Sequence, residues 1–251
     1  MSLVIKKSQD NWAKSKQKIK KHNQINKPYE STIAFKKFLE KNNLLSKKIN
    51  HIVDVGTGLG THLDYFSKKN TKIKFTGIDY SSRLIQEAKK LKKKKNINFF
   101  KVNVLKKNNN KIISNCDGVT CIQTLCAFKD IEKPIKFMCS LTPKWIAINS
   151  LFYDGLLDVQ IRIKDYNDLN SYLGGDGDFN IFSMQITSKV FKKYGYKLTK
   201  LIPFYPKKKL SKIKNGGKGS YTIKNGFKKN IAFSGPVYLP WHFILAKKIA
   251  R

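Results

Sequence analysis

Short apolar runs alternate with amphipathic segments through the middle of the chain, and this alternation restricts the fold more than any other feature. Runs typical of buried strands cover 49–55, 73–78, 97–104, 117–123 and 145–151, and segments typical of helices cover 59–69, 81–94 and 131–140. Parallel strands need long connections, usually helical, that cross the sheet in a right-handed sense. The pattern therefore predicts an α/β fold, a Rossmann-like doubly wound sheet with helices on both faces.

The two ends of the chain depart from this alternation. Residues 1–48 are rich in Lys and hold an amphipathic segment at 32–40, so we predict an N-terminal helical lid there. We expect the main domain to span 49–251. Within it, 152–184 and 206–235 are polar and contain Gly-rich turn signals, and we expect these two insertions to form a substrate cap. A helix pattern at 188–194 and strand patterns at 196–204 and 237–246 complete the domain.

A glycine-rich turn follows the first predicted strand. The sequence Ile52-Val53-Asp54-Val55-Gly56-Thr57-Gly58-Leu59-Gly60 runs from a hydrophobic strand through G-x-G-x-G into a helix, with Asp54 two residues before the first Gly. Glycines let a backbone turn tightly and approach a ligand without a Cβ in the way, and the helix N-terminus supplies unpaired N–H groups. Strand, turn and helix together predict a nucleotide-like cofactor site.

A second acid stands at the distance that such a site requires. The next predicted strand ends in Phe75-Thr76-Gly77-Ile78-Asp79, about 20 residues after the glycines. A carboxylate there can accept both hydroxyls of an adenosine ribose, and it would repel a phosphorylated ribose. We therefore expect Asp79 to bind an unphosphorylated ribose, which argues against NADP as the cofactor.

These residues resemble the first two motifs of the class I S-adenosylmethionine-dependent methyltransferases, over about residues 49–150. The resemblance implies a mostly parallel sheet of seven strands with a C-terminal antiparallel hairpin, and S-adenosyl-L-methionine as the cofactor. NAD-linked Rossmann enzymes share the glycine and acid logic, but their third Gly falls one residue later, where this chain has Thr61. The acid at Asp54 also favours the methyltransferase interpretation.

The resemblance further implies roles for single residues. Those that would surround the methionine portion of the cofactor are Asp54, Gly56, Thr57, Gly58 and Gly60. Asp79 would hold the ribose, with Tyr80 packed beside the adenine. The family often has an acid after the third strand that binds the adenine amine; this chain has Asn103 followed by Val104, and the Asn oxygen can accept the same hydrogen bond. Gln123 would lie where cofactor and substrate meet.

The chain carries a formal net charge of +35, which raises the question of nucleic acid as a partner. Lys outnumbers Arg 48 to 3, although Arg is the residue best suited to bidentate phosphate and guanine contacts. A genome rich in adenine and thymine would produce this balance without a functional cause. We therefore keep an RNA methyltransferase as the alternative, together with a non-catalytic RNA- or nucleotide-binding module.

One segment reverses the basic background. Between 151 and 183 there are six acids and only two basic residues: Asp154, Asp158, Asp165, Asp168, Asp176 and Asp178 against Arg162 and Lys164. Carboxylates and aromatic rings suit the hydroxyls of a sugar or an amine cation, and they would repel a nucleic-acid backbone. The candidates for a general base are Asp154, His62, His242 and Asp165, and those for substrate binding are Tyr29, Tyr153 and Tyr166. Packing or capping is the alternative role of both His62 and His242.

Two signatures of macromolecular methyltransferases are absent from the sequence: an Asn- or Asp-Pro-Pro-Tyr after the fourth strand and the Pro-Cys pair of the cytosine C5 enzymes. We therefore predict methyl transfer to O or N of a small polar metabolite, such as a sugar, an amino sugar or a related amine. No apolar run approaches the roughly 20 residues of a membrane span, and we expect a cytoplasmic protein. The oligomeric state stays open.

The four cysteines fall within one stretch that otherwise has the pattern of buried strand and helix. They are Cys116, Cys121, Cys126 and Cys139, and no two of them form a Cys-x-x-Cys pair. We expect packing residues in a reducing compartment. Since Cys and His lack the spacing of a zinc site, we expect no metal.

Overall fold

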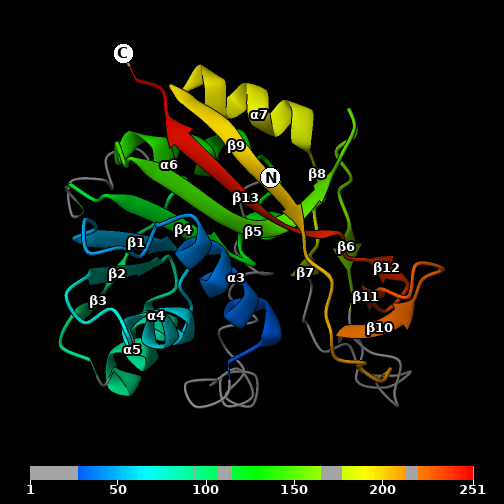
Figure 1. The fold of residues 1–251 in the computed structure, drawn as a ribbon, viewed down its shortest axis with the longest axis horizontal. Coiled ribbons are helices and arrows are strands. Elements are labelled where there is room, and N and C mark those ends of the chain that lie inside the picture. Colours follow the sequence, from blue (N-terminus) through cyan, green and yellow to red (C-terminus); the bar gives the residue numbers. More distant parts are fainter. Residues whose placement is uncertain are drawn as a thin grey trace.

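The structure is a computed structural model that describes residues 28–92, 94–106, 113, 115–164, 177–212 and 220–250. Its main sheet has the strand order β3-β2-β1-β4-β5-β13-β9, with β8 paired to the end of β5 (Figure 1). The strands of this path are β1 (His51–Val55), β2 (Lys74–Asp79), β3 (Ile97–Lys101), β4 (Gly118–Ile122), β5 (Trp145–Tyr153), β9 (Tyr196–Pro203) and β13 (Trp241–Lys248). The first five are parallel, and β13 is antiparallel to both β5 and β9. The predicted seven-stranded sheet with an antiparallel C-terminal end is confirmed.

Helices cover both faces of this sheet, as the crossovers require. The helices are α3 (Glu30–Lys41), α4 (Thr61–Ser67), α5 (Ser82–Leu91), α6 (Glu132–Ser140) and α7 (Met184–Lys193). One core cluster joins α3, α4 and α5 to one face through residues such as Phe35, Phe66 and Ile85. The other joins α6 and α7 to the opposite face through Met138 and Phe191.

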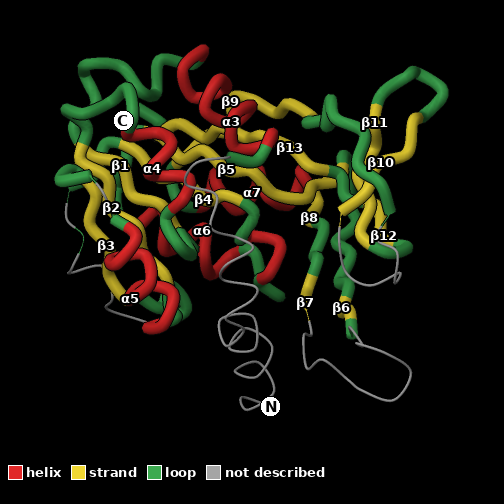
Figure 2. Tube along the Cα trace, turned by 90° about the horizontal axis from the view of Figure 1, so that it is seen from below, coloured by secondary structure: helices red, strands yellow, loops and turns green. Residues whose placement is uncertain are grey.

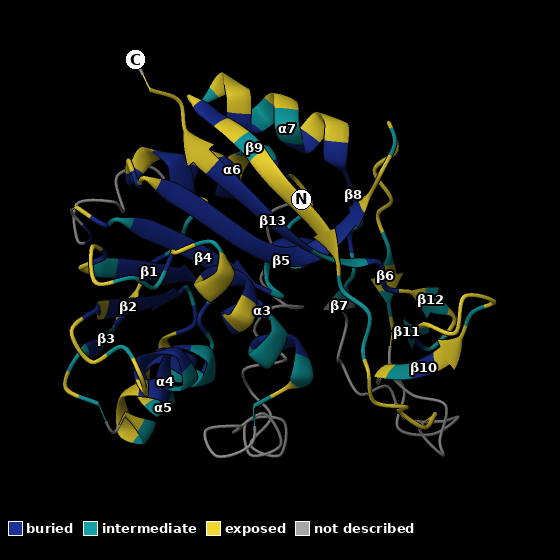
Figure 3. Ribbon diagram, viewed as in Figure 1, coloured by how far each residue is buried: buried dark blue, intermediate teal, exposed yellow. Residues whose placement is uncertain are grey.

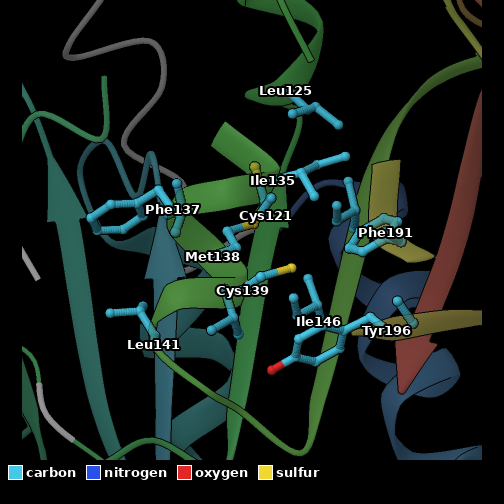
Figure 4. Close-up of a cluster of buried hydrophobic side chains, with 14 of the residues drawn as sticks. Cys121, Leu125, Ile135, Phe137, Met138, Cys139, Leu141, Ile146, Phe191 and Tyr196 are labelled. Carbon is cyan, nitrogen blue, oxygen red and sulfur yellow. The ribbon is translucent and has the colours of Figure 1, made fainter. Parts of the chain in front are cut away.

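All four cysteines are buried and unbonded to one another, as expected of packing residues. Cys121 on β4 and Cys139 on α6 lie among aliphatic and aromatic side chains of the α6–α7 face (Figure 4). Burial raises the pKa of Cys139 to about 12, so this thiol stays protonated and unreactive at neutral pH. Their role is therefore to fill space between strands and helices.

Two helix starts differ from the sequence prediction. The α3 helix begins at Glu30, two residues before the amphipathic segment predicted at 32–40, with Tyr29 as N-cap and Ser31 buried in the first turn. The α7 helix begins at Met184, four residues before the predicted start, because the Ser183 hydroxyl caps it by accepting the Ile186 N–H at 3.2 Å. By contrast, Ser81 caps α5 at the start of the predicted helix pattern 81–94, accepting the Leu84 N–H.

Both insertions contain strands of their own. In 152–184, β6 (Arg162–Ile163) pairs with β7 (Gly177–Asp178), and β8 (Phe182–Ser183) pairs in parallel with the end of β5. After β9, a separate sheet of three strands forms from β10 (Ser220–Lys224), β11 (Asn230–Ser234) and β12 (Val237–Tyr238). This small sheet and the β6–β7 pair lie beside one end of the main sheet in both ribbon and tube views (Figures 1 and 2).

The small sheet is much less buried than the main one (Figure 3). The small sheet packs beside the carboxyl end of β5 and the start of β13. Ligands of open α/β sheets bind at this edge, where the parallel strands end. No helix in the described part of the chain has the length and apolar character needed to cross a bilayer.

Candidate functional site

The glycine loop between β1 and α4 is held against the end of β2. The Gly56 and Thr57 N–H groups both donate to the Ile78 carbonyl, at 2.9 and 3.0 Å. Gly56, Gly58 and Gly60 all have positive φ, between 55° and 72°, which residues with a Cβ rarely adopt. A Cβ on Gly60 would lie 2.3 Å from the Phe99 ring, and one on Gly56 would lie 2.2 Å from Thr124 Cγ2. Because a larger residue would overlap Thr124 or Phe99, only glycine fits at these two positions without rearrangement.

Gly58 differs from its two neighbours. A Cβ built on it would meet nothing within 4 Å, so this part of the loop faces open space. The bare backbone of Gly58 and the start of α4 behind it form a cradle that a ligand can approach closely. This cradle fits the methionine portion of S-adenosylmethionine, for which the sequence proposes Gly56, Thr57, Gly58 and Gly60.

Asp79 ends β2 beside this cradle. Its Oδ2 accepts the Gly58 N–H at 3.1 Å, and its Oδ1 accepts the Ser81 N–H at 2.9 Å. Burial raises the pKa of Asp79, while the backbone donors at Ser81, Gly58 and Tyr80 oppose that rise. The carboxylate is thus positioned by both elements that would flank a cofactor ribose.

Asp54 lies inside the sheet rather than on its surface. It is 1% exposed, and its Oδ1 accepts the Thr120 hydroxyl from the neighbouring strand β4 at 2.7 Å. Burial raises the pKa of Asp54 to about 7, against the opposing effect of Thr120 and Thr57. A cationic ligand above the glycine loop would favour the charged form of this acid. Thr120 was not singled out from the sequence, because a lone Thr in an apolar strand carries no signal.

The first turn of α3 is bound to three different elements through three consecutive residues. Glu30 accepts the backbone N–H groups of Lys207 and Lys208, at 2.7 and 3.2 Å. Ser31 accepts the Gln123 side-chain amide at 3.1 Å. Thr32 forms a 2.9 Å hydrogen bond with His62 Nδ1. The start of α3 therefore connects the β9–β10 segment, the end of β4 and the start of α4.

Gln123 stands directly after β4 in a left-handed conformation, with φ of 53°. Such strain in a non-glycine residue is most often kept at functional positions. Its N–H donates to the Asn149 carbonyl at 2.8 Å, and the Asn149 side chain donates to the His242 carbonyl at 3.2 Å. Asn149 thus connects the end of β4 with the start of β13. Sequence reasoning missed it, although an Asn within the apolar run 145–151 was a usable signal.

Asn103 and Val104 follow β3 and are half-buried. The Asn103 Oδ1 accepts the Leu105 N–H at 3.0 Å, which fixes the turn after β3. The Val102 N–H donates to the Asp79 carbonyl, so this turn lies beside the end of β2 and the half-buried Tyr80. The four predicted adenosine-binding positions, Asp79, Tyr80, Asn103 and Val104, therefore lie close together at one edge of the sheet.

The predicted base candidates lie apart from one another in two groups. His62 lies between α4 and α3, where burial lowers its pKa to about 4 and Thr32 binds it. This is the environment of a packing residue. His242 lies at the start of β13, opposite Ser150 of β5, where burial lowers its pKa, and the hydrogen bond to the Pro240 carbonyl and the charge of Asp154 oppose that change. Among the described candidates, Asp154 is near enough to His242 for its charge to act on the imidazole.

The predicted substrate-binding residues are placed as follows. Tyr153 ends β5 with 48% of its surface exposed and stacks over Gly155. Tyr29 precedes α3 and is partly exposed, and burial raises its pKa. Asp165 and Tyr166 lie outside the described residues. His242 itself lines a small cavity with Tyr205, Tyr238 and Trp241.

Comparison with known proteins identifies relatives of the fold and of one segment of the chain. A family model described as a methyltransferase domain matches residues 53–141. The methyltransferase domain of bacterial CtHen1-C is similar in fold, with a TM-score of 0.56 and 16% identity over 88% of this chain and 98% of that one. No curated protein sequence matches the chain.

Two further solved structures share the fold. A putative S-adenosylmethionine-dependent methyltransferase from Listeria monocytogenes has a TM-score of 0.55 at 13% identity, over 86% of this chain and all of that one. Magnesium protoporphyrin IX methyltransferase from Synechocystis PCC 6803, with bound S-adenosylhomocysteine, has a TM-score of 0.52 at 11% identity, over 98% of this chain and 87% of that one. Fold, glycine loop and strand-end acid define a Rossmann-like methyltransferase. Residues 53–141 thus match a methyltransferase domain, and the described chain has the fold of S-adenosylmethionine-dependent methyltransferases.

Proposed function

We propose that this methyltransferase acts on a hydroxyl of a small polar metabolite such as a sugar, with His242 as the proton acceptor. The observation that carries the proposal is the 2.9 Å hydrogen bond between His242 Nδ1 and the Pro240 carbonyl. A carbonyl can only accept, so Nδ1 carries the proton and the lone pair is on Nε2. A lowered pKa keeps this imidazole neutral at pH 7. A hydroxyl acceptor benefits from such a base more than an amine does.

The position of His242 agrees with this role. It lies two strands from the end of β4, since β13 pairs with β5 and β5 pairs with β4. Neighbouring strands are 4.7–4.9 Å apart, so His242 and Gln123 are separated by about 10 Å across the sheet edge. A molecule the size of a monosaccharide can span that distance.

S-adenosylmethionine, when bound, supplies an electrophilic methyl group on its sulfonium. We infer that the glycine loop and Asp54 hold its methionine portion, and that Asp79, Tyr80, Asn103 and Val104 hold its adenosine. Gln123 then lies between the cofactor and the acceptor. His242 Nε2 would take the proton of the acceptor hydroxyl during methyl transfer, so that the oxygen is free to accept the methyl group. The carboxylate of Asp154 favours the imidazolium that forms.

The experiment is a methylation screen with labelled cofactor against pools of sugars, amino sugars, other small amines and bulk RNA. We expect transfer to a small metabolite, and a loss of kcat of about 10²–10⁴-fold in His242→Gln with unchanged binding of S-adenosylhomocysteine. The matched control is His51→Gln, because His51 lies at the opposite edge of the sheet, bonded to Thr76.

The pH profile gives a second readout. The base form of His242 exists above a pKa that burial holds below 6.5, so the rate should rise with pH on the acid side and level off before neutrality. The His242→Gln variant should lose this acid limb. Methylation of bulk RNA and of no small metabolite would defeat the proposal.

A further inference from the structure

Three aromatic side chains form a row across the small sheet. Tyr221 of β10 pairs with Phe233 of β11, and Phe233 pairs with Tyr238 of β12. The Tyr221 and Phe233 rings are stacked at 5.6 Å between centroids, and the Phe233 and Tyr238 rings are 5.8 Å apart. Tyr238 is 45% exposed, so the row reaches solvent. Planar aromatic surfaces of this kind bind other planar rings, nucleobases above all.

This row is continuous with the proposed acceptor site. Tyr238 lines the same cavity as His242, together with Tyr205 of the segment after β9. On the other face of the small sheet, Ala232 and Leu239 are buried against Leu151 of β5. The small sheet is therefore packed against β5, the strand that pairs with β13 beside His242.

Cations flank the rings. Lys212 Nζ lies 5.8 Å from the Tyr221 ring centre, and Lys229 Nζ lies 4.8 Å from that of Tyr205. The whole segment 179–251 contains 16 Lys and Arg251 without a single acid. The segment after β5, which packs against the small sheet through Phe179 and Ile181, carries Asp154 and Asp158, and Asp158 accepts the Ser183 N–H. This end of the sheet therefore carries both lysines and carboxylates.

We propose that the acceptor is delivered as a nucleoside diphosphate conjugate: the base stacks on the row of Tyr221, Phe233 and Tyr238, the diphosphate meets the lysines, and the sugar reaches His242. The inference rests on the proposed function and names its substrate class. The acidic segment argues against a long polyanion, because a nucleic-acid strand crossing this edge would pass Asp154 and Asp158. A short anion with a hydroxyl-rich end matches a surface that carries both lysines and carboxylates.

The test is calorimetric titration of the full chain with UDP and GDP in the presence of saturating S-adenosylhomocysteine, which keeps the cofactor's adenosine site filled. Pyrophosphate, free glucose and a ten-nucleotide oligo(U) are the comparison ligands. We expect at least one nucleoside diphosphate to bind about tenfold or more tightly than pyrophosphate, because only the former can stack. Tyr238→Ala should weaken it about tenfold, and Tyr238→Phe, which keeps the ring, should not.

The charge contribution has its own variants. Lys212→Ala with Lys229→Ala should weaken the nucleoside diphosphate severalfold and make its binding less dependent on salt. Lys197→Ala is the matched control, because Lys197 pairs with Lys247 at the opposite end of β9. Glucose should show no binding without the nucleotide.

Three results would overturn the inference: equal binding of pyrophosphate and both nucleoside diphosphates, no effect of Tyr238→Ala, or oligo(U) binding that exceeds both with the steep salt dependence of many phosphate contacts. The proposed function fails separately. If free sugars are methylated and no nucleoside diphosphate binds, the function stands and this inference falls. If UDP or GDP binds while His242→Gln keeps full activity, the role of His242 falls instead.

Discussion

Asp79 and Gly58 are joined by a 3.1 Å hydrogen bond between the carboxylate and the backbone N–H, which fixes the glycine loop against the end of β2. The second carboxylate oxygen accepts the Ser81 N–H, so the same acid also fixes the approach to α5. One side chain thus determines the relative position of the two elements that would flank the cofactor. Because Asp79 makes both hydrogen bonds without a ligand, the glycine loop already has a fixed position before the cofactor binds.

Replacing Asp79 by Asn should therefore weaken cofactor binding. An amide group offers one acceptor oxygen where the carboxylate offers two, and its NH₂ would face a backbone donor. Since a hydrogen bond to a charged group contributes about 1.5–3 kcal/mol, we expect S-adenosylhomocysteine affinity to fall by about 10–100-fold, measured by calorimetry.

Asp117→Asn is the matched control. Asp117 also accepts two backbone N–H groups, from Asn50 and His51, but at the opposite edge of the sheet. It should lose stability and keep its affinity for S-adenosylhomocysteine. Equal affinity of Asp79→Asn and the native chain would contradict the assignment of Asp79.

Gly58 and Gly60 offer a comparison within one loop. Both have positive φ, but a Cβ on Gly60 would overlap the Phe99 ring and a Cβ on Gly58 would enter open space. Gly60→Ala should lower the free energy of unfolding by several kcal/mol, since backbone strain and overpacking add. Gly58→Ala should cost about 1 kcal/mol of stability and still abolish measurable cofactor binding. Urea unfolding and calorimetry separate the two effects, and normal cofactor binding by Gly58→Ala would show that the open space does not receive the ligand.

Much of the main domain was predictable because its signals are local. The apolar run 49–55, the glycines after it and the acid at Asp79 lie within about 30 residues, and short-range patterns of this kind identify a strand, a turn and a helix. The start of α7 was not predictable, because Ser183 caps it from within a segment whose polar composition indicated a loop.

The rest of the site depends on long-range contacts. Gln123 and Ser31 are 92 residues apart in sequence, and Glu30 and Lys207 are 177 apart. Nothing in the local sequence of Ser31 distinguishes a helix cap from a buried partner of Gln123. The small sheet was likewise not predictable, because 206–235 has the turn signals of a loop and only strand pairing aligns its Tyr221 and Phe233 with Tyr238 of the predicted strand 237–246.

The Glu30 carboxylate should control the order of the segment after β9. Its two hydrogen bonds to Lys207 and Lys208 fix that segment to α3. Glu30→Ala removes both acceptors, so the segment should open more often and trypsin should cleave after Lys207–Lys209 severalfold faster. Ser31→Ala, which removes the neighbouring contact to Gln123, should leave this cleavage rate unchanged. Equal cleavage of Glu30→Ala and the native chain would mean that other contacts hold the segment.

Asp54 should make the stability of the protein depend on pH. Its folded pKa of about 7 lies above the ordinary value of 3.8, so the folded state binds the proton more tightly than the unfolded state does. Stability from this group is then greatest below about pH 4, falls as pH rises towards 7, and levels off above it. The full change corresponds to up to about 4 kcal/mol, at 1.36 kcal/mol for each pH unit.

The Asp54→Asn variant isolates this effect. Asn can still accept the Thr120 hydroxyl but has no charge to bury. Between pH 4.5 and pH 8 the native chain should therefore lose more of its free energy of unfolding than the variant does. Urea unfolding of both proteins at several pH values gives the difference between their free energies of unfolding. Asp79 and the other acids are present in both proteins, so their contributions largely cancel in this difference. Parallel stability curves would show that Asp54 titrates normally in the folded chain. A steeper fall of the native curve would place a buried, readily protonated acid directly beneath the glycine loop.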